Sequence, residues 1–275
     1  MAESKRKPSS KVAAAFAKFP APTAQAAGPI CKDLLGGGKA VVDELLALVG
    51  EAFGDAEGVK AKYALHGMAL YAGRPGAPGD RKMVAAALAA HLGANHSEDL
   101  KAFVCRQLQY CGRDDDVRAL APLLAHERLC EPAAQALAAI GGAKATAALR
   151  HALRSAESKR RVTVITALGF LADTDALPDI RGAATNADPN VRLAALYALA
   201  NAGDAQAVDI CIKAIGAKAS FERSQAFDAC LLLARRMKES GRTREATGML
   251  ARLADSPKGK WTRHEQHALK QARGA

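Results

Sequence analysis

A short motif recurs along this chain at a spacing of about 31 residues. Leu137, Leu168 and Leu199 each follow an alanine and precede a glycine within a few positions, and each lies 31 residues from the next. The same series extends, at less regular spacings, to Leu70, Leu108, Cys230 and Leu269. A fixed period of this size is typical of a repeat architecture, in which every repeat is one supersecondary unit. The chain is therefore expected to fold as a stack of similar units.

One stretch shows how each unit is built. Asp188 precedes Pro189, which places a capping carboxylate before a proline at the first helical position. Apolar residues then recur at helical spacing over 191–202, Gly203 ends this helix, and Asp204 caps a second one. A single pair of short helices cannot bury its apolar faces, whereas stacked pairs can. The pattern therefore predicts an α-solenoid of helical hairpins.

The residues from Asp188 to Asp204 follow the pattern Asp-Pro-x-Val-Arg-x-x-Ala-x-x-Ala-Leu-(x)3-Gly-Asp. This pattern resembles the short HEAT repeat of phycobilisome-lyase-like proteins, whose period is shorter than the ordinary HEAT period of about 40–47 residues. The resemblance covers about residues 56–255 and is strongest from 128 to 219. It implies an all-α fold, a right-handed α-α superhelix of about six to seven short hairpins. It implies a fold rather than a function, because such repeats serve many purposes.

The expected domain organisation follows from the repeat. Residues 1–28, which are rich in proline, lysine and serine, are expected to form a basic disordered tail, and residues 29–275 the solenoid. Caps are expected at 30–55 and 256–275, and the repeats are expected near 56–93, 96–127, 128–157, 158–188, 189–219 and 220–255.

Composition supports the all-α prediction and indicates a compartment. Hydrophobic residues make up 49% of the chain but aromatic residues only 4%, which favours closely packed alanine-rich helices over strands. The six cysteines form no C-x-x-C pair, so structural thiols in a reducing compartment are expected rather than a zinc site. No signal peptide and no apolar run of about 20 residues is present, so a cytoplasmic protein without a membrane partner is expected.

Local motifs do not indicate an active site. Leu35–Ala40 resembles the end of a phosphate-binding loop, but Asp33 stands where its first glycine is needed and Ala40 replaces the Ser/Thr. A helix break is therefore expected there. The carboxylates of Asp114–Asp116 lie between two predicted helices, where acidic residues cap and complement the helix dipole.

The resemblance brings three activities to consider. Deoxyhypusine hydroxylase, which such repeat proteins are similar to, uses four His-Glu pairs for two irons, whereas here His126-Glu127 and His264-Glu265 are two pairs out of register. HEAT-like DNA glycosylases stack aromatic side chains on DNA, and this chain has a single tryptophan, Trp261. For a bilin lyase the repeat says nothing about a pocket. No enzyme activity, catalytic residue, cofactor or metal is therefore expected.

Basic residues are in excess, with 39 Lys and Arg against 28 Asp and Glu, and the excess lies in residues 1–32 and 201–275. Arg150 and Arg181 recur in register within second helices, which line the concave face in the resembling family. A ladder of arginines there suits phosphates or an acidic protein. The candidate partner-binding residues are Arg150, Arg154, Lys159, Arg160, Arg161, Arg181, Lys213, Arg235, Arg236, Arg242 and Arg244.

The leading functional hypothesis is a non-catalytic scaffold that binds a macromolecular partner, preferably a protein, through its concave face. The alternative is a nucleic-acid-binding solenoid that uses the basic tail and the basic C-terminal third, although few aromatic side chains are available for stacking. An enzyme of a HEAT-repeat family is the third hypothesis. Simple solvation of a helical surface also accounts for many of the basic residues.

Overall fold

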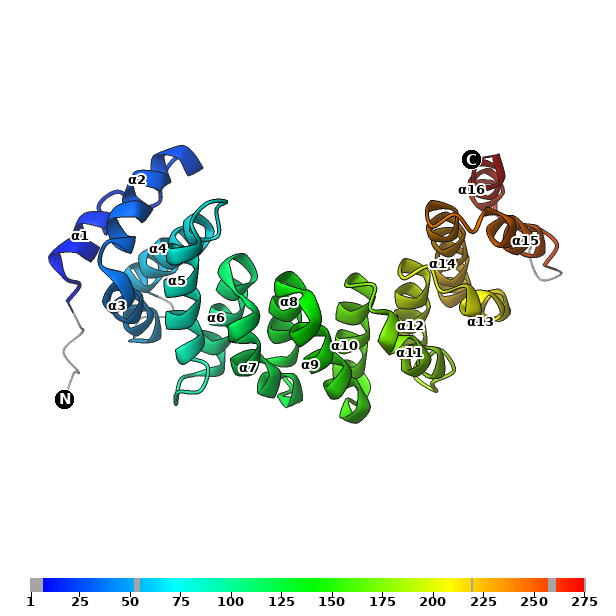
Figure 1. Ribbon diagram of the computed structural model, residues 1–275, viewed down its shortest axis with the longest axis horizontal. Coiled ribbons are helices and arrows are strands. Elements are labelled where there is room, and N and C mark those ends of the chain that lie inside the picture. The colour runs from blue at the N-terminus through cyan, green and yellow to red at the C-terminus, as the bar shows by residue number, and fades with distance from the viewer. Residues whose placement is uncertain (1–6, 52–54, 219, 257–260, 275) are drawn as a thin grey trace. The chain divides into compact units, whose positions relative to one another are not determined.

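The computed structural model describes residues 7–51, 55–218, 220–256 and 261–274. Every regular element in these ranges is helical, with sixteen α-helices and four short 3-10 helices (Figure 1). The all-α prediction is confirmed. The chain divides into two compact units, residues 1–148 and 149–275. No helix among the described residues is both long enough and apolar enough to cross a membrane.

The first unit is built from consecutive antiparallel helices. α4 packs against α2, α3 and α6, and α6 packs against α8, while α5 packs against α3 and α6. The helices are α1 (Ser10–Phe16), α2 (Ala24–Leu35), α3 (Gly38–Glu51), α4 (Ala56–Ala72), α5 (Pro78–Ala90), α6 (Glu98–Cys111), α7 (Val117–Leu120) and α8 (Cys130–Ile140), with 3-10 helices at Asp114–Asp116 and Ala121–Ala125. α9 (Gly142–Ser155) runs from this unit into the next.

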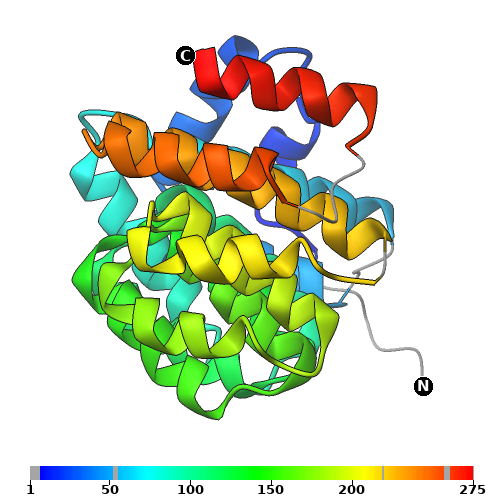
Figure 2. The same ribbon diagram turned by 90° about the vertical axis from the view of Figure 1, so that its right-hand side faces the viewer.

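The second unit shows the repeat most regularly. The first helices of successive hairpins, α10, α12 and α14, pack side by side, and the second helices α11 and α13 pack on α12 and α14. α16 packs against α14 and α15 (Figure 2). The elements are α10 (Ser158–Phe170), α11 (Leu177–Ala183), α12 (Pro189–Asn201), α13 (Val208–Ala214), α14 (Ser220–Glu239), α15 (Thr243–Ala254) and α16 (Arg263–Gly274), with 3-10 helices at Thr174–Ala176 and Ala205–Ala207.

The predicted capping residues act as expected. The Asp188 side chain accepts a hydrogen bond from the Asn190 N–H, and Pro189 takes the first helical position of α12. Gly203 has a φ of +66°, which favours glycine, and Asp204 then caps a 3-10 turn that leads into α13. In unit 1, Gly38 likewise has a positive φ at the predicted helix break between α2 and α3.

The repeating anchors form the core. Leu108, Leu137, Leu168, Leu199 and Cys230 are all 0% exposed. Burying each side chain of this size stabilises the fold by roughly 1.5–3 kcal/mol. Each hairpin therefore buries one anchor side chain, and these anchors recur at the repeat period.

The assignment of Leu70 to the same series is wrong, because its side chain is 47% exposed. In α4 the buried stripe runs through Leu65, Met68, Ala69 and Ala72, which lie three, four and seven positions along one helical face. Leu70 falls outside that stripe. Leu269, the other distant member, is buried in α16.

The first helices approach one another very closely in unit 2. A Cβ at Gly169 of α10 would lie 2.6 Å from the Cβ and 2.7 Å from the Cα of Ala198 on α12. A residue without a side chain is therefore required at Gly169, and a small residue, alanine, lies opposite it. The low bulk of the sequence thus sets the spacing between neighbouring repeats.

Replacing Gly169 with alanine is expected to lower the free energy of unfolding by roughly 1–3 kcal/mol, because the added methyl group meets backbone that cannot move aside. Gly248 is the matched control, since it lies within α15 and a Cβ there meets nothing within 4 Å. Gly248→Ala is expected to stabilise by up to about 1 kcal/mol through helix propensity. Urea denaturation followed by circular dichroism measures both. Equal effects of the two substitutions would contradict the tight crossing.

The structure differs from the predicted disordered tail over residues 9–28. Val12, Ala15 and Phe16 of α1 are buried, and they are spaced as one face of a helix. Ser9 donates hydrogen bonds to Glu44 of α3 from its N–H at 2.6 Å and its hydroxyl at 2.9 Å. Prolines and lysines in this segment suggested disorder, but three spaced apolar side chains suffice once neighbouring helices cover them. Residues 1–6 lie outside the described part of the chain.

We expect trypsin to cut slowly after Lys11 and Lys18 in the native protein, because cleavage requires α1 to detach from its neighbours. Phe16→Ala removes a buried ring and is expected to accelerate both cuts at least tenfold. Ala13→Ser, an exposed change on the same helix, serves as the control. A mass-spectrometric time course measures the two sites. Rapid cleavage at both lysines in the unmodified chain would contradict the docking of α1 and support a disordered tail.

Candidate partner-binding surface

The two arginines predicted to form a ladder are held by aspartates of the next repeat. Arg150 Nη1 lies 2.9 Å from Asp173 Oδ1 and 2.8 Å from Asp175 Oδ2. Arg181 Nη1 lies 2.6 Å from Asp204 Oδ2. Asp173 and Asp204 have side chains only 8% and 7% exposed, and each lies 23 residues after its arginine. The in-register arginines therefore link one repeat to the turn of the following repeat.

Further arginines of unit 2 also form hydrogen bonds to a neighbouring repeat, in these cases to an amide and a backbone carbonyl. Arg236 donates to Asn201 Oδ1 at 2.9 Å, and the Asn201 amide donates to the Gly169 carbonyl at 2.8 Å. Arg242 donates to the Gly203 carbonyl at 2.6 Å. These bonds satisfy polar groups near the C-terminal ends of α10 and α12, which helices leave without intrahelical partners. Their arginines hold the stack together.

Substituting Arg181 with methionine is expected to lower the free energy of unfolding by roughly 1–3 kcal/mol, because the buried Asp204 carboxylate loses its cation. Arg244→Met is the control, since Arg244 is exposed and the described residues give it no ion pair. Denaturant unfolding measures both variants. A double-mutant cycle with Asp204→Asn should show coupling between the two sites, and strict additivity would contradict the link.

Two grooves in unit 2, each lined by residues of first and second helices, are copies of one another. The first groove has a volume of about 430 Å³ and lies between the end of α9, the start of α10, and α11. Its lining residues are Leu153, Arg154, Arg161, Pro178, Asp179, Gly182, Ala183 and Asn186. The residue 31 positions after each of these eight residues lines the second groove. The grooves are thus a feature of the repeat itself.

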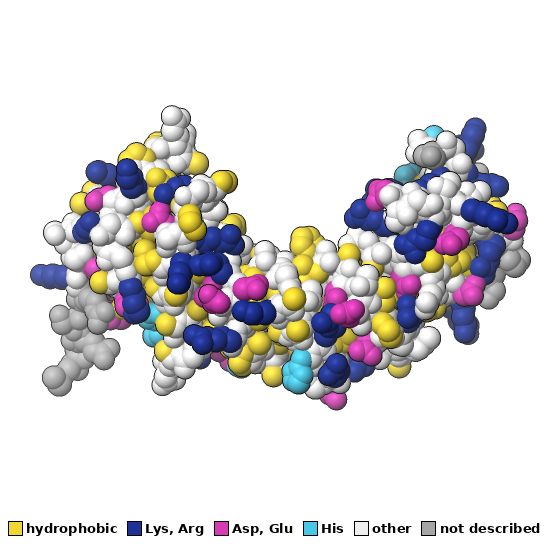
Figure 3. All heavy atoms as spheres, in the orientation of Figure 1, with side chains coloured by type: hydrophobic (Ala, Val, Ile, Leu, Met, Phe, Trp, Pro, Cys, Tyr) yellow, Lys and Arg dark blue, Asp and Glu magenta, His cyan; other side chains and the backbone are white. Residues whose placement is uncertain are grey.

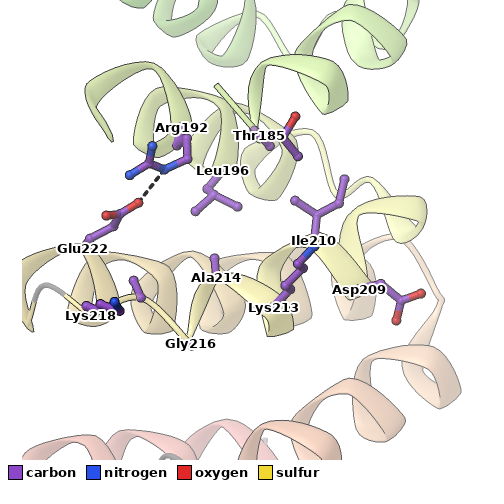
Figure 4. A pocket seen from close by; sticks show the side chains of 12 residues that line it. Thr185, Arg192, Leu196, Asp209, Ile210, Lys213, Ala214, Gly216, Lys218 and Glu222 are labelled. Carbon is purple, nitrogen blue, oxygen red and sulfur yellow. Dashed lines mark hydrogen bonds and ion pairs between the residues drawn. The ribbon is translucent and has the colours of Figure 1, made fainter. Parts of the chain in front are cut away.

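The second groove is larger, with a volume of about 760 Å³, and different side chains line it (Figure 4). Thr185 replaces Arg154, Ile210 replaces Asp179, and Lys213 replaces Gly182. Leu196 of α12 points into the groove, and the Asp209 carboxylate points away from it. Asp209 Oδ1 forms an ion pair with Arg252 Nη2 at 2.8 Å. The second copy is therefore more apolar than the first.

The arginine shared by both grooves is neutralised in only one of them. In the second groove Arg192 Nε lies 2.7 Å from Glu222 Oε1, whose side chain is 16% exposed. The hydrogen bond from Arg192 holds the pKa of Glu222 below its usual value, so this carboxylate stays ionised. In the first groove the described residues give Arg161 and Arg154 no ion pair. The first groove therefore presents two arginines without an ion pair against the single carboxylate of Asp179.

The remaining predicted site residues lie as follows. Lys159 and Arg244 are exposed, Arg160 is half-buried on α10, and Lys213 is exposed at the second groove. Arg235 lies 3.8 Å from Glu239 of its own helix. Figure 3 shows Lys and Arg over the visible face of each unit with Asp and Glu among them. The structure brings Arg154 and Arg161 together at the first groove.

Sequence reasoning missed Leu196, Ile210 and the pairing of Arg192 with Glu222. A signal was present in the sequence, because the groove positions recur at the 31-residue period already found through the leucines. Comparing the repeats position by position shows where a charged residue in one becomes aliphatic in the next. Without the structure, nothing indicates that those positions line a groove.

Two other polar features belong to the structure of the fold. Burial raises the pKa of Cys105 and Cys111 to about 12, which keeps these thiols protonated and poorly nucleophilic. In unit 1, His91 Nδ1 lies 3.0 Å from His96 Nε2, and His91 Nε2 lies 2.9 Å from Asp43 Oδ1. His91 Nε2 thereby ties α3 to the end of α5, and its Nδ1 contacts the loop that follows α5.

His126, considered for an iron site, lies 3.2 Å from Glu98, and Glu265 accepts hydrogen bonds from Thr262 at the start of α16. Within the described ranges, no group of three or more His, Cys, Asp or Glu side chains is arranged to hold a metal ion.

Comparison with known proteins identifies the repeat. Residues 146–230 match the family model described as HEAT repeats, so this stretch consists of HEAT repeats and the HEAT-repeat prediction is confirmed there. No curated protein sequence matches the chain.

Solved structures similar to this chain include other repeat proteins. The complex of CpcE and CpcF of phycocyanin lyase from Nostoc sp. PCC7120 is 20% identical, with a TM-score of 0.41 over 92% of this chain and 97% of that one. An archaeal HEAT-like repeats protein from Thermococcus onnurineus NA1 is 14% identical, with a TM-score of 0.37 over 98% and 97%. A chain from work on a phosphorylation switch that controls the cadherin–beta-catenin interaction is 15% identical, with a TM-score of 0.39 over 96% and 55%.

Proposed function

We propose that this chain is a non-catalytic scaffold that binds an acidic segment of a partner protein at the two grooves of unit 2. The observation that carries the proposal is the first groove, where Arg154 and Arg161 face a cavity of about 430 Å³ without an intramolecular ion pair. Arginine presents a planar fork that matches a carboxylate. Arg150 and Arg181 form internal salt bridges, whereas Arg154 and Arg161 remain available to bind a partner.

A protein partner fits the grooves better than a nucleic acid does. The walls combine cations with aliphatic side chains, including Leu153 in the first groove and Leu196 in the second. Asp179 and Glu222 interrupt the positive charge, so the arginines and lysines form no continuous track for a phosphate backbone. Non-specific binding to single strands also relies on aromatic platforms, and the grooves contain none.

Fluorescence anisotropy tests this proposal with three labelled probes, which are a 12-residue peptide of alternating Glu and Gly, a single-stranded DNA and a duplex RNA. The peptide is expected to bind, and Arg154→Glu combined with Arg161→Glu is expected to weaken binding at least tenfold, about 1.4 kcal/mol. Arg244→Glu combined with Lys270→Glu makes the same charge change outside the grooves and is expected to weaken it less than threefold.

Tighter binding of DNA or RNA than of the peptide, with a steep dependence on salt, would favour the nucleic-acid alternative. Failure of all three probes to bind would reject the grooves as an acidic-partner site. Equal loss of binding in both charge-reversal variants would assign the effect to overall charge rather than to the first groove.

A further inference from the structure

The two grooves differ in a way that selects a particular arrangement of side chains in a ligand. The first groove offers two arginines against one carboxylate, that of Asp179. In the second groove Arg192 is already neutralised by Glu222, and Ile210 occupies the position of Asp179. One copy therefore suits an anionic side chain, and the next suits an aliphatic one.

We propose, building on the proposed function, that the ligand is an extended peptide with a carboxylate in the first groove and a large aliphatic side chain in the second. The cavity of about 760 Å³ lined by Leu196 and Ile210 is large enough for a leucine or isoleucine. Lys213 and Lys218 line the same groove, so further acidic residues flanking the aliphatic one find complementary charge. A purely acidic segment leaves the aliphatic wall of the second groove without a contact, and a purely apolar segment leaves Arg154 and Arg161 unpaired.

The spacing between the two ligand side chains follows from the repeat. The grooves are equivalent positions in successive repeats, whose first helices α10 and α12 pack directly on each other. Packed helices lie about 8–10 Å apart, and a peptide in the polyproline II conformation advances about 3.1 Å per residue and returns to the same face every three residues. The carboxylate and the aliphatic residue are therefore separated by about three positions in the peptide.

The two grooves differ in their lining side chains, whereas the buried core positions of the same repeats do not. Leu168 and Leu199 are both buried and identical, because the core requires the same side chain in each repeat. The groove positions face solvent and carry no such requirement. Arg154 becomes Thr185 and Asp179 becomes Ile210, so a charged site and an apolar site lie next to each other.

The test compares four labelled 12-residue peptides on a Gly-Ser background that carries no other charged side chain. One carries Glu-x-x-Leu, one Leu-x-x-Glu, one Glu-Leu at adjacent positions, and one Glu-x-x-Ser. One of the two three-residue spacings is expected to bind roughly tenfold tighter than both the adjacent pair and the serine peptide. The preferred order then gives the direction in which the peptide lies.

Two matched variants locate the aliphatic contact. Ile210→Ser is expected to abolish the preference for leucine over serine while leaving binding of the serine peptide within threefold. Ile212→Ser removes an equivalent side chain on the same helix that does not line the groove, and it is expected to retain the preference. Circular dichroism melting of both variants checks that they fold alike.

Each outcome separates this inference from the proposed function. If all four peptides bind alike and Arg154→Glu with Arg161→Glu weakens them equally, the acidic-partner function stands and the aliphatic subsite is wrong. If none of the peptides binds, both are rejected. A leucine preference that survives Ile210→Ser would overturn the placement of the aliphatic side chain in the second groove.

Discussion

Burial of one aliphatic or thiol side chain per repeat is the interaction on which the rest of this structure depends. Leu108, Leu137, Leu168, Leu199 and Cys230 are fully buried, and no single hairpin contains enough apolar surface to bury such a residue alone. Neighbouring first helices must therefore pack together. At Gly169 and Ala198 only the alanine methyl group lies between the two backbones, which explains the preference for alanine and glycine over bulky residues.

Close packing of the first helices leaves polar groups at the helix ends to be satisfied. Aspartates and glycines cap the turns, and arginines from the neighbouring repeat complete the hydrogen bonding, as Arg181 does at Asp204 and Arg242 does at the Gly203 carbonyl. A large share of the basic residues in unit 2 is thereby structural. Net charge alone is a poor guide to a binding surface in such a protein, because a cation held by a buried carboxylate presents little charge to a partner.

The side chains that remain available lie where the structure makes no demand on them. Both grooves recur because the helical hairpin recurs, and their linings differ because solvent-facing positions vary without cost to the core. Repeat proteins build recognition from such positions, with a constant framework and a variable face. In unit 2 this places an arginine-lined groove one repeat away from an aliphatic one.

The sequence by itself determined the helical class, the 31-residue period, the caps at Asp188 and Asp204, and the buried anchor leucines, because these depend on residues that are neighbours along the chain. Only the tertiary structure decided that α1 docks and that Leu70 faces solvent. It also decided which arginines are available. Arg161 and Arg192 occupy equivalent positions 31 residues apart, but Arg192 pairs with Glu222 of the next repeat, whereas the described residues give Arg161 no acidic partner. Contacts between residues distant in sequence depend on packing, which a local pattern does not contain.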